Sequence, residues 1–303
     1  MTIADLASFT FERPANLAAL CARVTELVVA GTPHVLLAGG TDFMVEQEMR
    51  KPFGAAGAPA EPPHVLDVSR LAELRGIALH GDVLRIGSAT TYAEMRRDPA
   101  VRERAALIER MARDVGAVTI QARGTLGGNL ATASPAADGV AALAAYDAVI
   151  VVESATNGAR RIAFPELQTG YKTSTRAADE VIVAIELKLP AAGSQWFWRK
   201  VGTRRAQSIS KVALAGVAEL EGGQVVRCGL GMASVAPVTA LLPRTRALFL
   251  SKPLKAIDDR TLDKAVEADV TPIDDVRSTR AYRLHVACAV VRDFARSLRG
   301  AAP

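Results

Sequence analysis

Small and polar residues are concentrated in one segment of this chain, residues 119–138 (TIQARGTLGGNLATASPAAD). Glycine lets a backbone approach a ligand closely and adopt positive φ angles, and successive N–H groups in such a turn can bind a phosphate. We therefore expect Gly127 and Gly128 to lie against an anion, with a positive φ at Gly128. Asn129 adds an amide, and Asp138 could accept a hydrogen bond from a ribose hydroxyl. The alternative is a tight turn followed by an Ala-rich helix.

A second glycine segment favours the ligand over the plain turn. Residues 35–42 read VLLAGGTD, and residues 43–49 have the composition of a helix. A strand, a glycine turn and a helix N-terminus together form a common phosphate site. The segment matches neither GxGxxG nor GxxxxGK[ST], which excludes the Rossmann and P-loop templates. Two separate glycine segments predict a long cofactor that is held at both ends.

Five motifs in sequence order carry a family resemblance. AGGTD at 38–42, GSATTY at 87–92 and TLGGNLATASPAAD at 125–138 resemble the FAD-binding subunit of the molybdenum hydroxylases, of the xanthine dehydrogenase and carbon monoxide dehydrogenase medium-subunit type. GYKT at 170–173 and RKVGTRRAQSISKV at 199–212 are similar to later motifs of the same family. The resemblance extends over nearly the whole chain.

The resemblance implies an α+β fold in two parts. Residues 1–190 would form a PCMH-type FAD-binding domain with subdomains at about 1–60 and 61–190. Residues 195–303 would form a C-terminal α/β domain with a small antiparallel sheet and helices, after a linker at 190–194. FAD is then the cofactor of this chain, and no residue acts as a catalytic group.

Positions that match the family's motifs are the expected FAD contacts, and Tyr171 is a further candidate for approaching the ring. Lys200 matches a basic residue near the flavin, where a cation would stabilise the reduced anionic ring. Its alternative is a surface lysine beside Trp198. The expected contacts are Leu36, Leu37, Ala38, Gly39, Gly40, Thr41, Asp42, Phe43, Thr125, Leu126, Gly127, Gly128, Asn129, Asp138, Ile182 and Lys200.

The same resemblance implies a multi-subunit oxidoreductase. Electrons would reach FAD from [2Fe-2S] clusters in one partner subunit, after leaving a substrate at a molybdopterin cofactor in a large partner subunit. A dimer of such heterotrimers is expected, with NAD, oxygen or another compound as the final acceptor. The motif at 199–212 is more similar to the branch that hydroxylates purines and other N-heterocycles.

Bulk properties agree with a cytoplasmic electron-transfer subunit. The 303 residues are half hydrophobic, yet no stretch is long and uncharged enough for a membrane span. Cys21, Cys228 and Cys288 are far apart and the four histidines show no ligand spacing, so we expect neither disulfides nor metal sites. The net charge of +5 is spread along the chain without interleaved aromatic residues, which disfavours a nucleic-acid partner.

Hydrophobic periodicity and turn residues predict the main elements. Hairpins are expected around Gly81-Asp82 and Asn157-Gly158, and a capping box at Thr91 and Glu94. Helices are expected at 16–30, 100–114, 136–146, 262–268 and 282–298, and strands near Phe9 and Phe11, at 64–68, 149–152, 181–189, 212–220 and 225–232. In the 181–189 strand, Val181, Val183, Ile185, Leu187 and Leu189 should share one face.

Two other functions remain open from the residues. One is a self-contained flavin reductase of the same FAD-binding superfamily, which would need its own substrate site in the C-terminal third. The other is a scaffold subunit that has lost FAD. Intact glycine segments disfavour the scaffold, and absorbance near about 450 nm would distinguish it from a flavoprotein.

Overall fold

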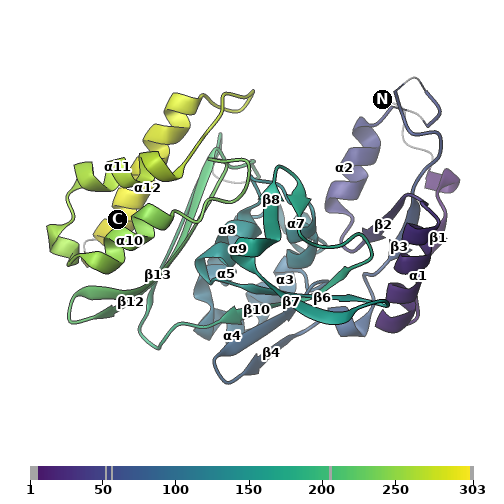
Figure 1. Cartoon of the computed structure of the whole chain (residues 1–303), viewed down its shortest axis with the longest axis horizontal. Coiled ribbons are helices and arrows are strands. Elements are labelled where there is room, and N and C mark those ends of the chain that lie inside the picture. Colours follow the sequence, from purple (N-terminus) through teal and green to yellow (C-terminus); the bar gives the residue numbers. More distant parts are fainter. Residues whose placement is uncertain (1–5, 52, 56, 205–206, 301–303) are drawn as a thin grey trace.

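Four sheets organise the chain in the computed structural model, which describes residues 6–51, 53–55, 57–204 and 207–300. Over these ranges a three-stranded parallel sheet is followed by a five-stranded antiparallel sheet, a two-stranded sheet and a three-stranded antiparallel sheet. Helices pack between and around them (Figure 1). The predicted mixed α+β class, with a small antiparallel sheet and helices at the C-terminal end, is confirmed.

The N-terminal unit is a parallel sheet in the order β1-β3-β2. Asn16 caps α1, because its side chain accepts a hydrogen bond from the Ala19 amide. Phe9 is not part of the predicted strand; it precedes β1 and packs edge-on against Phe43 and Phe53 in a small apolar cluster. The elements are a 3-10 turn at Leu6–Ser8, β1 Phe11–Glu12, α1 Leu17–Val29, β2 His34–Leu37, α2 Thr41–Met49 and β3 His64–Asp67.

The five-stranded sheet has the order β4-β5-β10-β6-β7 and carries both predicted hairpins. Strand β10 departs from the predicted alternation, because a register shift lies between Ile182 and Ala184. Val183 and Ala184 are consequently both buried, and the shift moves Ile185 into a different apolar cluster. The strands are β4 Ile77–His80, β5 Val83–Gly87, β6 Val149–Ser154, β7 Gly158–Ala163 and β10 Val181–Lys188.

Short helices cover this sheet and connect its strands. The capping box at Thr91 and Glu94 is present. The single helix predicted at 100–114 is wrong: Ala105 leaves the helical region (φ −134°, ψ 46°), a break that periodicity cannot reveal because the same face stays buried on both sides. The elements are a 3-10 turn at Ala72–Leu74, α3 Tyr92–Arg97, α4 Pro99–Arg104, α5 Ala106–Arg113, α6 Val118–Gln121, α7 Leu126–Ala131, α8 Asp138–Ala145, α9 Phe164–Leu167, β8 Gln168–Gly170 and β9 Thr173–Ser174.

The C-terminal unit is a sheet in the order β11-β12-β13 with helices on one side (Figure 1). The predicted helix at 282–298 is confirmed, and all of its apolar stripe except Tyr282 is buried. Strand β11 and helix α10 were missed by sequence reasoning. The elements are β11 Gln195–Val201, β12 Val212–Glu221, β13 Gln224–Ala233, α10 Pro243–Ser251, a 3-10 turn at Leu254–Ala256, α11 Asp259–Asp269 and α12 Arg280–Leu298.

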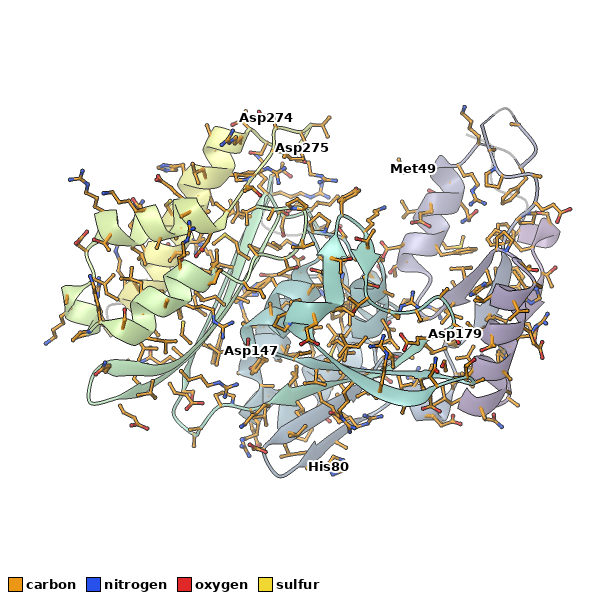
Figure 2. All side chains as sticks on the ribbon, viewed as in Figure 1. Met49, His80, Asp147, Asp179, Asp274 and Asp275 are labelled. Atoms are coloured by element: carbon orange, nitrogen blue, oxygen red, sulfur yellow. The ribbon has the colours of Figure 1, made fainter. Side chains whose placement is uncertain are left out.

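Helix α8 packs on β12 and β13 of the C-terminal sheet and shares an apolar cluster with the five-stranded sheet, and every one of its residues is buried. A Cβ at Gly229 of β13 would lie 1.9 Å from the Ala145 oxygen, and one at Gly231 would lie 2.1 Å from the Ala141 oxygen. The Ala-rich helix therefore packs directly on the backbone of β13. Asp147, labelled at this junction in Figure 2, pairs with Arg246 of α10 at 3.0 Å. Among the described residues no helix is long and apolar enough to cross a bilayer.

Candidate functional site

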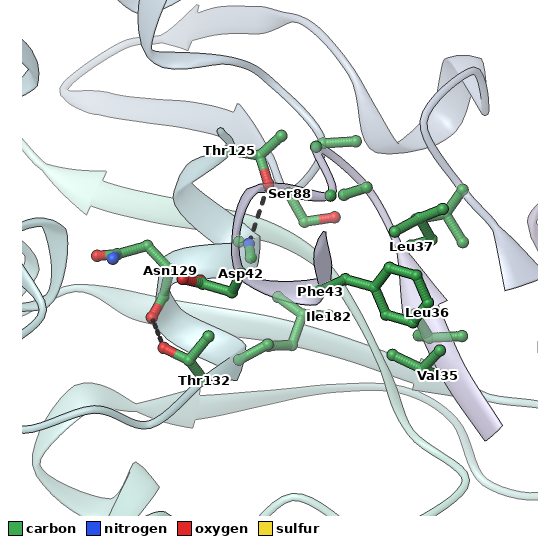
Figure 3. Close-up of a pocket in the computed structure, with 18 of the residues that line it drawn as sticks. Val35, Leu36, Leu37, Asp42, Phe43, Ser88, Thr125, Asn129, Thr132 and Ile182 are labelled. Carbon is green, nitrogen blue, oxygen red and sulfur yellow. Dashed lines mark hydrogen bonds between the residues drawn. The ribbon is translucent and has the colours of Figure 1, made fainter. Parts of the chain in front are cut away.

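A cavity of about 600 Å³ lies between the N-terminal unit and the five-stranded sheet, and both glycine segments line it. Figure 3 shows Leu36, Leu37 and Phe43 on one side of it, with Asn129 and Thr132 on the other. Its volume falls in the range of roughly 300–1,000 Å³ that is typical of ligand pockets. Parallel strand β2 delivers the first segment to this cavity, and α7 carries the second.

The first glycine segment forms the predicted turn between strand β2 and helix α2. Gly40 precedes α2 with φ 75° and ψ 3°, a left-handed conformation that favours glycine. No side chain caps α2, and the first N–H groups of a helix lack acceptors within it. These amides at Thr41 and Asp42 are therefore the backbone donors that best suit a phosphate in the cavity.

The second glycine segment does not offer the free amides expected from its sequence. The Gly127 amide donates to the Ser88 oxygen at 3.0 Å, and the Gly128 amide donates to Thr125 Oγ1 at 3.0 Å. The reason is that Thr125 caps the short helix α7, whose start also pairs with the loop before α3. This segment therefore presents glycine surfaces to a ligand while its own N–H groups stay satisfied.

Close packing explains several of the glycines. A Cβ at Gly39 would lie 2.0 Å from the Arg123 oxygen, so the two glycine segments touch each other. A Cβ at Gly127 would lie 2.5 Å from the Ser88 oxygen. Gly128 differs, because it lines the cavity and a Cβ there would meet only Thr125 Oγ1, at 2.9 Å. The expected positive φ at Gly128 is wrong, because the residue lies inside α7.

All of the predicted site residues line the cavity except Leu126, Asp138 and Lys200. Leu126 is fully buried in the core. Tyr171 is 63% exposed and lies off the cavity wall. Sequence reasoning missed several lining residues, and the GSATTY motif was the signal for the first two of them. The missed residues include Ser88, Tyr92, Val115, Ile120, Thr132 and Arg176.

Asp138 and Lys200 bind each other beside the cavity instead of lining it. Lys200 Nζ lies 2.5 Å from Asp138 Oδ2 and donates to the Asp114 oxygen at 3.0 Å, and Ser210 Oγ donates to Asp138 Oδ1 at 2.6 Å. Burial raises the pKa of Asp138 above its ordinary value, and the Lys200 ammonium opposes that rise. The surface-lysine alternative for Lys200 is wrong, because its side chain is 10% exposed. The pair joins α8 to β11.

The other end of the cavity carries charge from the loop before β10. Arg176 donates to the backbone oxygen of Glu180, and both residues line the cavity. The Glu180 carboxylate is bound by Arg160, and this hydrogen bond lowers the pKa of Glu180. Burial lowers the pKa of Arg176. With Asp42 and Glu46 also on the wall, the cavity is not strongly cationic.

The residues present fit a large nucleotide cofactor. Buried Tyr92 Oη and Asn129 Oδ1 have no hydrogen-bond partner among the described residues, and both residues line the cavity. Such orphaned groups are costly unless a ligand or water satisfies them. The apolar side chains of Leu36, Val115 and Ile182 lie on the same walls, where a flat aromatic ring of a cofactor could pack against them. No group of three or more His, Cys, Asp or Glu residues in the described ranges could hold a metal ion.

Comparison with known proteins agrees with this site. Residues 7–192 match the family described as the FAD binding domain in molybdopterin dehydrogenase, and residues 198–298 match the CO dehydrogenase flavoprotein C-terminal domain. The putative xanthine dehydrogenase FAD-binding subunit of Escherichia coli K12 is 28% identical over 273 residues, 89% of this chain and 90% of that protein. The nicotinate dehydrogenase FAD-subunit of Eubacterium barkeri is 31% identical over 183 residues, 59% of each chain.

A solved structure shares the whole architecture. Carbon monoxide dehydrogenase from Hydrogenophaga pseudoflava, in a form that lacks the Mo-pyranopterin moiety, contains a chain with a TM-score of 0.86 and 26% identity. The match covers 94% of this chain and 95% of that one. The family match covers more than half of the sequence and includes both glycine segments. The chain is therefore an FAD-binding medium subunit of the molybdopterin-dependent hydroxylases, a flavoprotein component of molybdenum-containing oxidoreductases.

Proposed function

We propose that this chain carries FAD in the cavity between its two glycine segments and passes electrons from the [2Fe-2S] clusters of a partner subunit to an acceptor. The observation that carries the proposal is the cavity of about 600 Å³ that both segments line within a matched FAD-binding domain. When bound, FAD supplies the redox chemistry, because its ring can exchange electrons one or two at a time.

The chain's own residues would bind and orient that cofactor. The turn at Gly39 and Gly40 and the N-terminus of α2 suit the pyrophosphate. Tyr92 and Asn129 line the same cavity, with Tyr92 Oη and Asn129 Oδ1 directed toward Gly139 at the start of α8. Asp138 and Lys200 would act from behind Asn129, since a Cβ at the neighbouring Gly139 would lie 2.5 Å from Asn129 Oδ1.

The proposal includes two partner subunits, one with [2Fe-2S] clusters and one with the molybdopterin cofactor, assembled as a dimer of heterotrimers. It is supported by the relatives, whose names include medium chains and FAD-subunits of xanthine, carbon monoxide and nicotinate dehydrogenases. The cysteines of this chain are free and buried at separate places, which suits neither cluster ligands nor disulfides. A cytoplasmic complex with NAD, oxygen or another acceptor follows from the same proposal.

The substrate that we propose is a purine or another N-heterocycle, on the similarity of the 199–212 motif and the nicotinate and xanthine relatives. We also propose that the chain divides into an FAD-binding domain at 1–190, with subdomains near 1–60 and 61–190, and a C-terminal domain at 195–303. The order of the sheets along the chain and the short connection between β10 and β11 support that division.

Turnover with and without partners tests the function. The native complex, purified through a tag on this chain, should contain molybdenum and iron and should reduce a dye with xanthine or nicotinate. The isolated chain should contain FAD but oxidise neither substrate, because hydroxylation with water needs the molybdenum subunit. Metal-free oxidation of either substrate by the isolated chain would contradict its role as an electron-transfer subunit.

A further inference from the structure

A second cavity, of about 360 Å³, adjoins the cofactor cavity but is distinct from it. The two cavities share Ala38, Gly39, Ala89 and Thr125, so they adjoin where Gly39 of the first glycine segment contacts Arg123. None of the functions assigned above uses this second space. Its remaining walls come from the loop after β3, from α3 and from the residues before α7.

Arginine dominates the lining of the second cavity. Arg70, Arg75, Arg97 and Arg123 border it, and Glu94 is the one carboxylate among its described lining residues. All four arginines are exposed, so each can keep its charge and still reach a ligand. The cofactor cavity has the opposite character, with more acidic than basic side chains on its wall.

The bonds of two arginines place their guanidinium groups along this cavity. Arg75 donates to the Ser69 oxygen at 2.9 Å and pairs with Glu94, and Ser69 and Glu94 both line the same space. Arg123 Nε donates to the Gly39 oxygen at 3.3 Å. The Glu94 carboxylate also accepts a hydrogen bond from the Thr91 amide in the capping box of α3.

The guanidinium groups of Arg70 and Arg97 have no hydrogen-bond acceptor and no ion-pair partner in the part of the chain that the structure describes. Elsewhere arginines are commonly matched with acids, as in the pairs Arg13 with Asp67, Arg246 with Asp147 and Arg292 with Asp263. Unmatched like charges around one concave space repel each other and attract an anion. The guanidinium fork matches phosphate oxygens in particular.

We propose that the second cavity is a binding site for a phosphate-bearing small molecule, separate from the FAD site. The shared chemistry is a phosphate or pyrophosphate group held by Arg70, Arg97 and Arg123. Its source is either a free inorganic anion or the phosphates of a nucleotide. The cavity has room for a nucleotide-sized ligand, since its volume lies within the range of roughly 300–1,000 Å³ seen for small-molecule sites.

Calorimetric titration of the flavin-loaded protein tests this site while the cofactor occupies its own cavity. Inorganic pyrophosphate and ADP are titrated separately at about 0.01 M ionic strength, where charges are weakly screened. One pyrophosphate should bind per chain. ADP binding more tightly than pyrophosphate identifies a nucleotide site, and the reverse order identifies a free-anion site.

Arg70→Gln combined with Arg97→Gln should weaken binding by at least about tenfold, because charge-assisted hydrogen bonds are among the strong ones. Arg104→Gln combined with Lys252→Gln removes the same net charge at exposed positions outside the cavity. This control should change the affinity by less than about twofold. The site does not exist if pyrophosphate and ADP both fail to bind, or if the control weakens binding as much as the arginine pair does.

Discussion

Gly128→Val is expected to weaken FAD binding by roughly 5- to 150-fold, because overpacking a fitted site costs roughly 1–3 kcal/mol. Gly128 lines the cofactor cavity, and an added Cβ would meet nothing but Thr125 Oγ1, at 2.9 Å. The branched side chain would therefore extend into the space that the cofactor needs. The change is measured as the flavin content of the purified protein, with circular dichroism to confirm that the fold is kept.

Gly170→Val is the matched control for that experiment. A Cβ at Gly170 would also lie 2.9 Å from a threonine hydroxyl, that of Thr173, but Gly170 is outside the cavity. This variant should keep its full flavin content. If the two valine variants lose flavin equally, local strain explains the loss and Gly128 does not contact the cofactor.

Lys200→Met is expected to lower the free energy of unfolding by about 3–5 kcal/mol, the usual cost of leaving a buried charge without its partner. Asp138 would retain only the Ser210 hydroxyl, at 2.6 Å, in a nearly buried position. Because Lys200 lies on β11 and Asp138 begins α8, the variant should also loosen the contact between these elements. Urea unfolding followed by tryptophan fluorescence measures the change.

Two further variants separate the ion pair from simple loss of a lysine. Lys188→Met removes an exposed lysine at the end of β10 and should have little effect. Lys200→Met combined with Asp138→Asn should cost less than the sum of the single changes, because the second change removes the stranded charge. Equal destabilisation by Lys188→Met and Lys200→Met would contradict the structural role of the pair.

Local chemistry in the sequence was enough to predict several of the elements around the cofactor cavity. Gly40 needs its left-handed conformation at the end of β2, and the Thr91 and Glu94 capping box opens α3 as expected. Both hairpins follow from their Gly81 and Asn157-Gly158 turns. These signals are readable because each depends on residues only a few positions apart.

The details that could not be predicted depend on distant partners. The Gly127 amide donates a hydrogen bond to the Ser88 backbone oxygen, and no local sequence pattern predicts that these two residues are in contact. Lys200 and Asp138 are 62 positions apart, and their pairing follows from the packing of the C-terminal sheet on α8. Strand β11 was missed because its burial does not alternate. Tertiary contacts therefore decide which predicted residues line the cavity.

The flavin content of the purified wild-type protein tests the central claim most directly. Absorbance near about 450 nm and acid extraction should give one FAD per chain, released in free form, since no histidine or cysteine lies within either glycine segment to form a covalent flavin link. A colourless protein that fails to take up added FAD, either alone or with its partner subunits, would contradict the account. Flavin that stays attached to the polypeptide after acid treatment would contradict the non-covalent site.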